Sequence, residues 1–190
     1  MSARKWTSVQ LRSATSSSST SPTTTPDHPK EDFMRRKERE VKEREAIEEI
    51  LRACKVCRLA MNGEDGVPYV VPLNFGYTWS GEQPVFYLHS AQSGRKLDLL
   101  AKDARVCFEM DCDYVLEGKA DDACTYTNRY ASVIGTGRCE LIASDEEKEA
   151  GLRCLMQHVA GDQDWKFDPR WMGKTAVLRV RTEQLTAKRH

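Results

Sequence analysis

The chain has 190 residues, and its 29 Lys and Arg balance its 29 Asp and Glu, so the formal net charge is +0. This length allows one ordinary domain with its own core. The balanced charge argues against a global field that would recruit nucleic acid or an anionic membrane, and no apolar run approaches the roughly 20 residues of a membrane-spanning helix. Seven cysteines without a secretory signal pattern favour reduced thiols. We therefore expect a cytoplasmic protein with neither a nucleic-acid nor a membrane partner.

The N-terminal segment differs in composition from the rest of the chain. Ser13–Pro26 is almost entirely Ser, Thr and Pro, which bury too little apolar surface to offset the entropy of ordering. We predict a disordered tail over residues 1–33 and one folded domain over residues 34–190. The tail carries cations but no acid before Asp27. It is therefore either a transit peptide, which would send the protein to a mitochondrion or another organelle, or a featureless low-complexity extension.

The first half of the domain alternates between helical and strand patterns. Densely charged Arg35–Glu45 predicts a solvated helical approach to Ala46–Cys54, whose apolar residues recur at spacings of three and four. Turn sequences such as Asn62–Gly66 then separate shorter apolar segments. We expect strands at Cys57–Met61, Val67–Trp79, Val85–Ser90 and Arg105–Met110, and a helix at Arg95–Ala101.

The second half is harder to assign at its start. Tyr114–Asn128 is polar and contains Gly118, so we predict a loop with a strand inside it. Tyr130–Ile142 has the pattern of a long strand whose internal glycines indicate a bulge. Ser144 and Glu147 match a capping box. The remaining predicted elements are a helix with Leu152, Leu155, Met156 and Val159 on one face, an aromatic loop at Gly161–Met172 and a last strand at Lys174–Thr182.

This succession predicts the fold class. About six strands at hairpin-like spacing, with only a few helices, argue against a parallel sheet built from βαβ units. We therefore predict a mainly β protein, a small antiparallel barrel with flanking helices. The chain contains neither a Rossmann fingerprint nor a P-loop, so a nucleotide would have to be held in another way.

A predicted strand-to-helix junction carries the clearest chemical signal. It consists of a strand ending in His89 and Ser90, a loop closing on Gly94, and a helix opened by Arg95 and Lys96. Backbone N–H groups and the positive end of the helix dipole favour an anion there, and a phosphate group suits the two cations. The alternative is a basic pair on a solvated face, with Ser90 and Ser93 as caps and Gly94 as a turn residue.

The upstream strand shows a second pattern. In Tyr69–Tyr77 the large side chains alternate onto one face, which suits a barrel interior. The other face is low in bulk and consists of Val70, Pro72, Asn74 and Gly76. A planar ring could lie against that face and bond to the exposed backbone. Equally, Pro72 is tolerated wherever a strand lies at the edge of a sheet.

Histidine and cysteine leave further alternatives open. His89 is either a structural hydrogen-bonding residue or a proton donor. Cys54 and Cys57 have the internal spacing of zinc ligands. However, Cys54 ends an apolar helical stripe and Cys107 lies within a predicted strand, positions that favour buried thiols. We therefore predict no metal site.

Taken in order, four segments resemble the nitroimidazole-resistance protein family, which belongs to the flavin-binding split barrels related to pyridoxamine 5′-phosphate oxidase. The resemblance runs from about Met34 to Lys188. The segments are PYVVPLNFGY (Pro68–Tyr77), FYLHSAQSGRKLDLL (Phe86–Leu100), RVCFEMD (Arg105–Asp111) and YASVIGTGRCELI (Tyr130–Ile142).

The resemblance implies a six-stranded split barrel that forms a homodimer, with FMN or FAD in each of two clefts between the subunits. Tyr114–Asn128 departs from the family pattern and receives no role. The arginine-rich substrate motif of the larger pyridoxamine phosphate oxidases is missing, so pyridoxal phosphate synthesis is not expected. The residues that the resemblance places around the flavin and its phosphate are Pro72, Leu73, Asn74, His89, Ser90, Gly94, Arg95, Lys96, Tyr130 and Ser132.

The function implied by the resemblance is flavin-dependent oxidoreduction. A nicotinamide or similar donor would supply electrons, and a small acceptor such as a nitro-aromatic would receive them, with His89 as the candidate catalytic residue. The alternatives are a non-catalytic flavin- or haem-binding module of the same fold and a cofactor-free interaction domain.

Overall fold

The computed structural model describes residues 36–190, so the predicted tail lies outside the described residues. The helices are η1 (Lys37–Arg39, a 3-10 turn), α1 (Arg44–Ala53), α2 (Arg95–Lys102), α3 (Asp145–Ala160) and α4 (Pro169–Met172). The strands are β1 (Glu40–Val41), β2 (Cys57–Met61), β3 (Tyr69–Leu73), β4 (Phe75–Ser80), β5 (Gln83–Ala91), β6 (Arg105–Lys119), β7 (Asp122–Leu141) and β8 (Thr175–Arg189). None of the helices in this described part is long and apolar enough to cross a membrane.

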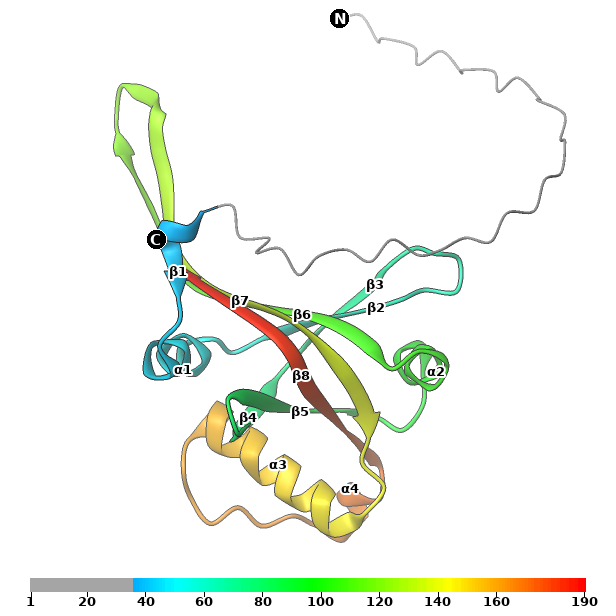
Figure 1. Ribbon diagram of the computed structural model, residues 1–190. Coiled ribbons are helices and arrows are strands. Elements are labelled where there is room, and N and C mark those ends of the chain that lie inside the picture. The colour runs from blue at the N-terminus through cyan, green and yellow to red at the C-terminus, as the bar shows by residue number, and fades with distance from the viewer. Residues whose placement is uncertain (1–35) are drawn as a thin grey trace, which may run out of the picture. The chain divides into compact units, whose positions relative to one another are not determined.

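All the strands belong to one antiparallel sheet with flanking helices (Figure 1). Its strand order is β3-β2-β6-β7-β8-β5-β4, and β1 pairs with β8. The two edge strands, β3 and β4, are separated in sequence only by Asn74. The chain therefore joins the two edges of the sheet directly, and the sheet curls into a barrel that stays open between β3 and β4. This confirms the predicted fold class, with eight strands in place of about six.

The barrel interior is filled by the alternating large residues. Phe75, Phe86 and Phe108 are almost fully buried, and the rings of Phe86 and Phe108 lie 4.9 Å apart. Each such ring contributes roughly 1.5–3 kcal/mol through burial. The apolar stripe of α1 adds Ile50 and Leu51 to this core. Figure 1 shows α1 and α2 on opposite sides of the barrel, with α3 lying along β4 and β5.

Three predicted elements were wrong. The single strand predicted over Val67–Trp79 is broken at Asn74, because the chain there passes from one edge of the sheet to the other. In the helical approach predicted at Arg35–Glu45, residues 37–41 form a 3-10 turn and then β1, which pairs with the end of β8. Only Arg44 and Glu45 are helical, as the start of α1. The loop predicted over Tyr114–Asn128 is a hairpin in which β6 and β7 continue to pair. Neither strand of that hairpin has a sequence pattern that predicts a strand. They form because the backbone N–H and C=O groups of each strand hydrogen-bond to those of the other.

The predicted bulge and helix start are present. The pairing of β7 with β8 shifts register between Thr136 and Gly137, where a Cβ on Gly137 would lie 2.2 Å from the carbonyl oxygen of Arg181. At α3, the hydroxyl of Ser144 accepts the N–H of Glu147 at 3.4 Å. The carboxylate of Glu147 does not turn back to complete the capping box; it accepts a hydrogen bond from Arg179 instead.

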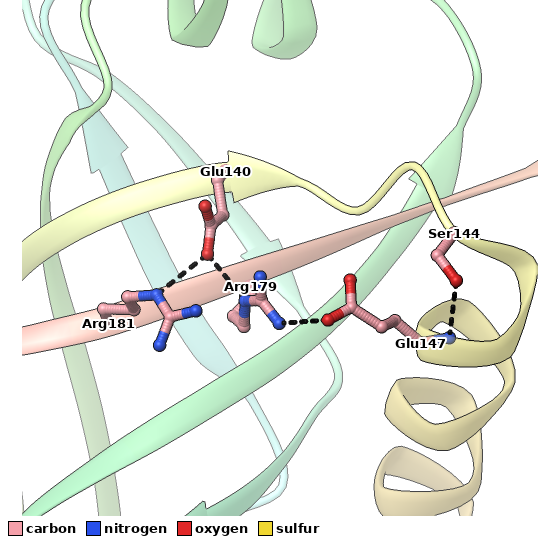
Figure 2. Close-up of polar contacts among 5 residues, drawn as sticks. All are labelled: Glu140, Ser144, Glu147, Arg179 and Arg181. Atoms are coloured by element: carbon pink, nitrogen blue, oxygen red, sulfur yellow. Dashed lines mark hydrogen bonds and ion pairs between the residues drawn. The ribbon is translucent and has the colours of Figure 1, made fainter. Parts of the chain in front are cut away.

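This contact ties α3 to the sheet (Figure 2). Arg179 of β8 lies between two carboxylates, 2.6 Å from Glu140 of β7 and 3.3 Å from Glu147 of α3. Arg181 also donates to Glu140 at 2.9 Å. The hydrogen bond from Arg179 is the main reason that the pKa of Glu140 is lowered. The network therefore fixes the first turn of α3 against β7 and β8.

Candidate functional site

The start of α2 leaves hydrogen-bond donors without partners. Gly94 is the N-cap residue, at φ 128° and ψ 165°, and no side chain caps the helix. Its carbonyl accepts the N–H groups of Leu97 and Asp98. The N–H groups of Arg95 and Lys96 have no acceptor within residues 36–190. The alternative role of Ser90 as a cap is wrong, since its hydroxyl donates to the carbonyl of Ala91. These free donors and the positive helix end suit an anion.

Lys96 and His89 share this place. Lys96 is half-buried, and burial lowers its pKa. Within the described part of the chain, no carboxylate lies within ion-pair distance of it. The pKa of His89 is lowered first by partial desolvation and then by the charge of Lys96. A Lys96 side chain without a carboxylate partner, whose charge already acts on His89, favours an external anion.

Arg95 points elsewhere. Its guanidinium carbon lies 4.7 Å from the centre of the Tyr69 ring on β3, a cation–π geometry. It also lines a cavity of about 370 Å³ with Glu64, Asp65 and Asp98. The two cations therefore do not form one equivalent pair. The charge of Lys96 acts on His89, whereas Arg95 packs on β3.

The predicted ring-binding strand approaches the same place. The pairing of Phe75 with Leu88 brings Asn74 next to His89. Pro72 is exposed on β3, an edge strand, so the edge position explains the proline and also leaves its face open. Leu73 packs against the core, and only its backbone is available to a ligand. The Asn74 side chain donates to the carbonyl of Lys55 at 3.0 Å, which fixes the break between the strands.

Gly76 does not belong to that open face. It is buried, and a Cβ on it would lie 2.5 Å from backbone atoms of Cys154 and Leu155 in α3. The low-bulk face predicted over Val70–Gly76 is thus divided between two strands, β3 and β4. Its β3 part is open, and its β4 part is closed by a helix.

Tyr130 and Ser132 lie far from His89 but closer to β3. Pro72 pairs with Arg58, Arg58 with Glu109 and Glu109 with Ile134, so three strand spacings, roughly 14 Å, separate β3 from β7 there. Ser132 pairs with Lys188 of β8, whereas His89 pairs with Val177. Roughly 35 Å of extended strand separates these two positions on β8. The backbone carbonyl of Tyr130 accepts the N–H of the C-terminal residue, and Figure 1 shows that end on the opposite side of the domain from α2. One copy of the chain therefore does not bring Tyr130 and Ser132 to His89.

The structure adds residues that the sequence did not single out. Tyr69, which the alternation places toward the core, also carries the guanidinium of Arg95. Gln92 donates to the carbonyl of Gly173, which holds α4 beside the end of β5. Trp171 of α4 is 68% exposed there. The sequence indicates Trp171 only as one residue of the predicted aromatic loop.

The cysteines of the described residues are free thiols. Cys54 and Cys57 are buried, and burial raises the pKa of Cys57 to about 12. A protonated thiol is a poor metal ligand. No group of three or more Cys, His, Asp or Glu side chains within residues 36–190 is placed to hold a metal.

Comparison with known proteins agrees with this architecture. The pyridoxamine 5′-phosphate oxidase family profile matches residues 43–189. A crystal structure of a candidate 5-nitroimidazole antibiotic resistance protein from Bacteroides thetaiotaomicron is 30% identical, with a TM-score of 0.68; the match covers 78% of this chain and 85% of that one. No curated protein matches the chain.

Two more distant structures share the fold. The flavocytochrome Anf3 from Azotobacter vinelandii is 22% identical, with a TM-score of 0.67 and coverage of 83% of this chain and 72% of that one. An FAD and heme binding protein from Mycobacterium smegmatis is 20% identical, with a TM-score of 0.68 and coverage of 80% and 73%. At these identities the likeness concerns the fold alone.

Proposed function

The chain belongs to the pyridoxamine 5′-phosphate oxidase family, and from this premise we propose that it is a flavin-dependent oxidoreductase. The substrate class is a small electron acceptor such as a nitro-aromatic, in line with the description of the Bacteroides relative. The electron donor is a nicotinamide or a similar reductant. One observation carries the proposal: the uncapped start of α2 packs on Tyr69 of β3 through Arg95, and the charge of its Lys96 acts on His89.

The residues present fit a flavin phosphate. The free N–H groups of Arg95 and Lys96 and the ammonium group of Lys96 are donors that suit a phosphate. On the exposed side of β3, Val70 and Pro72 are apolar, and Arg58 of β2, held by Glu109 and Asp111, lies beside Pro72. We propose FMN as the cofactor, because these donors account for a single phosphate. FAD would need a second set.

Each residue then has a distinct task. Lys96 neutralises the phosphate, and Arg95, stacked on Tyr69, stiffens the edge strand beside it. The lowered pKa of His89 favours the neutral imidazole, which can donate or accept a proton near a bound substrate. A bound flavin would supply electron transfer between donor and acceptor. The protein orients the donor and the acceptor relative to the flavin and limits the access of water to the site.

We further propose that the working unit is a homodimer. Tyr130 and Ser132 cannot reach His89 within one copy, because Ser132 and His89 pair at distant points of β8. A two-fold arrangement would bring Ser132 of one copy to His89 of the other and would complete two equivalent sites.

The absorbance of the purified protein tests the proposal. Bands near 375 and 450 nm, gained on isolation or on adding FMN, are expected of a flavoprotein. A Soret band would favour a haem module, and a colourless protein that ignores FMN would contradict the proposal. The double variant Arg95→Ala/Lys96→Ala should lose FMN affinity while keeping its circular dichroism spectrum.

Turnover needs a separate measurement. Anaerobic reduction of the holoprotein by NADH or NADPH, followed by addition of a nitroimidazole, should restore the oxidised spectrum. We expect His89→Ala to retain flavin and to change this rate. An unchanged rate across acceptors would show that the histidine is structural.

A further inference from the structure

The hairpin formed by residues 113–129, which we call the arm, projects beyond the barrel (Figure 1). A bulge sets it off from the sheet: Cys112 pairs with Ala131 and Val115 with Arg129, so two residues of β6 face one of β7. Asp113, at φ 61°, lies in this bulge. Beyond it the arm extends by roughly 17 Å of paired strand. The arm is the segment that departs from the family pattern in sequence.

The arm has one apolar face and one charged face. Leu116 pairs with Asn128, so alternation places Leu116 on the same face as Tyr126. The Tyr126 ring covers Gly118, where a Cβ would lie 2.6 Å from it. The opposite face carries an ion pair at 2.8 Å between Glu117 and Arg129. This arrangement separates apolar and charged side chains as a binding surface does.

The apolar face is open to solvent in one copy of the chain. Tyr114, Leu116 and Tyr126 are 62%, 65% and 46% exposed. An isolated two-stranded hairpin is only marginally stable in water, and solvent-exposed large apolar groups of this kind mark interaction sites. The arm therefore gains stability when this face is covered.

The apolar face is continuous with the second half of the proposed cofactor site. The Tyr114 ring stacks on that of Tyr130 at a centroid distance of 6.3 Å. By alternation, Tyr130, Ser132 and Ile134 share one side of β7, and Ile134 is 45% exposed. Whatever surface receives Tyr130 and Ser132 thus also receives the arm.

We propose that the apolar face of the arm docks on a second copy of this chain, beside the partner's α2 and β3, and forms one wall of that copy's cofactor cleft. This inference rests on the proposed function, in which a second copy must meet Tyr130 and Ser132. In a two-fold dimer each copy gives one arm and receives one. The arm then limits which acceptors reach the flavin.

Substitutions on the two faces test this docking. We expect Leu116→Glu and Tyr126→Glu each to weaken dimerisation by roughly tenfold or more, since each loses a buried apolar side chain and gains a charge. FMN affinity should fall with it. Val115→Glu is the matched control: Val115 is 42% exposed, neighbours Leu116, and faces Arg129 on the charged side. Sedimentation velocity and FMN titration measure both effects.

Cross-linking locates the docked arm directly. Cys107 and Cys124 are the exposed cysteines of the described chain, and Cys124 lies in the arm. In a Cys107→Ser background, a maleimide-benzophenone reagent on Cys124 should give covalent dimers on illumination. We expect the cross-linked peptides to come from α2 or β3. Exclusively intramolecular products would overturn the inference.

The outcomes separate the two proposals. If the arm variants keep wild-type dimerisation and FMN affinity, the arm inference is wrong while the flavin proposal stands. If the wild-type protein dimerises through the arm but binds no flavin, docking on a second copy holds and the oxidoreductase proposal is wrong.

Discussion

Strands β3 and β4 are consecutive in the chain and carry one alternating pattern, yet their low-bulk sides meet different surroundings. On β3, Val70 is 53% exposed and Pro72 is also exposed. On β4, Gly76 is buried against the backbone of α3. A strand position without a bulky side chain therefore indicates that another group packs closely against the strand. It does not distinguish a helix of the same chain from a ligand.

The strongest test of this difference compares one substitution to alanine on each side. Gly76→Ala places a Cβ 2.5 Å from backbone atoms of Cys154 and Leu155, which cannot rotate away. We expect it to lower the free energy of unfolding by about 3 kcal/mol or more. Val70→Ala, on the open side, should change it by less than about 0.5 kcal/mol. Urea denaturation measures both, and equal losses would contradict the comparison.

On the open β3 side, substituting Arg95 and Lys96 one at a time shows which of the two cations binds the phosphate. Lys96→Ala should weaken FMN binding by about 2 kcal/mol, the contribution of a hydrogen bond to a charged group. Arg95→Ala should have a smaller effect, because its guanidinium packs on Tyr69. Lys102→Ala, at the far end of α2, serves as the control. Fluorescence titration measures FMN affinity. A larger loss of affinity for Arg95→Ala than for Lys96→Ala would contradict the assignment of Lys96 to the phosphate.

The closed β4 side depends on how α3 is anchored. Ser144→Ala removes the side-chain acceptor for the N–H of Glu147 (Figure 2). We expect a loss of about 1 kcal/mol in stability, with Ser144→Asp restoring most of it. A loss as large as that of Gly76→Ala would mean that the cap, more than the close packing, holds the helix in place.

The smallest expected effect is a pH dependence on the closed side. His158 of α3 lies 4.4 Å from the Phe75 ring and its Nε2 hydrogen-bonds to the carbonyl of Cys54. Desolvation lowers its pKa below the usual 6.5. The unfolded chain therefore takes up this proton first, and stability should decline as the pH falls below 6.5 toward the folded pKa.

A variant isolates that contribution. His158→Gln keeps a side-chain donor but cannot titrate, so its unfolding free energy should vary less between pH 7 and pH 5 than that of the wild type. His89→Gln is the companion variant, because the pKa of His89 is lowered in the same direction. Identical pH profiles for wild type and His158→Gln would show that this imidazole does not differ between the folded and unfolded states.

Local sequence predicted the elements whose stability is local. Ser144 caps α3, and the helix that begins at Arg95 starts where its pattern predicts. The break at Asn74 was missed, because it is needed only when the two edges of the sheet meet. The arm was missed because its strands lack a buried face and are held by each other. The different directions of Arg95 and Lys96 were invisible because Tyr69, which draws Arg95 away, is remote in sequence.

The sequence by itself determined the mainly β class, the alternation that fills the barrel and the family to which the chain belongs. These follow from periodicity, turn residues and local motifs, which act over a few neighbouring residues. The tertiary structure alone decided that Gly76 packs against α3, that the charge of Lys96 acts on His89, and that Tyr130 and Ser132 lie far from His89. Such relations depend on contacts between residues distant in the chain, and strand pairing and helix docking fix those contacts only once the whole barrel has formed.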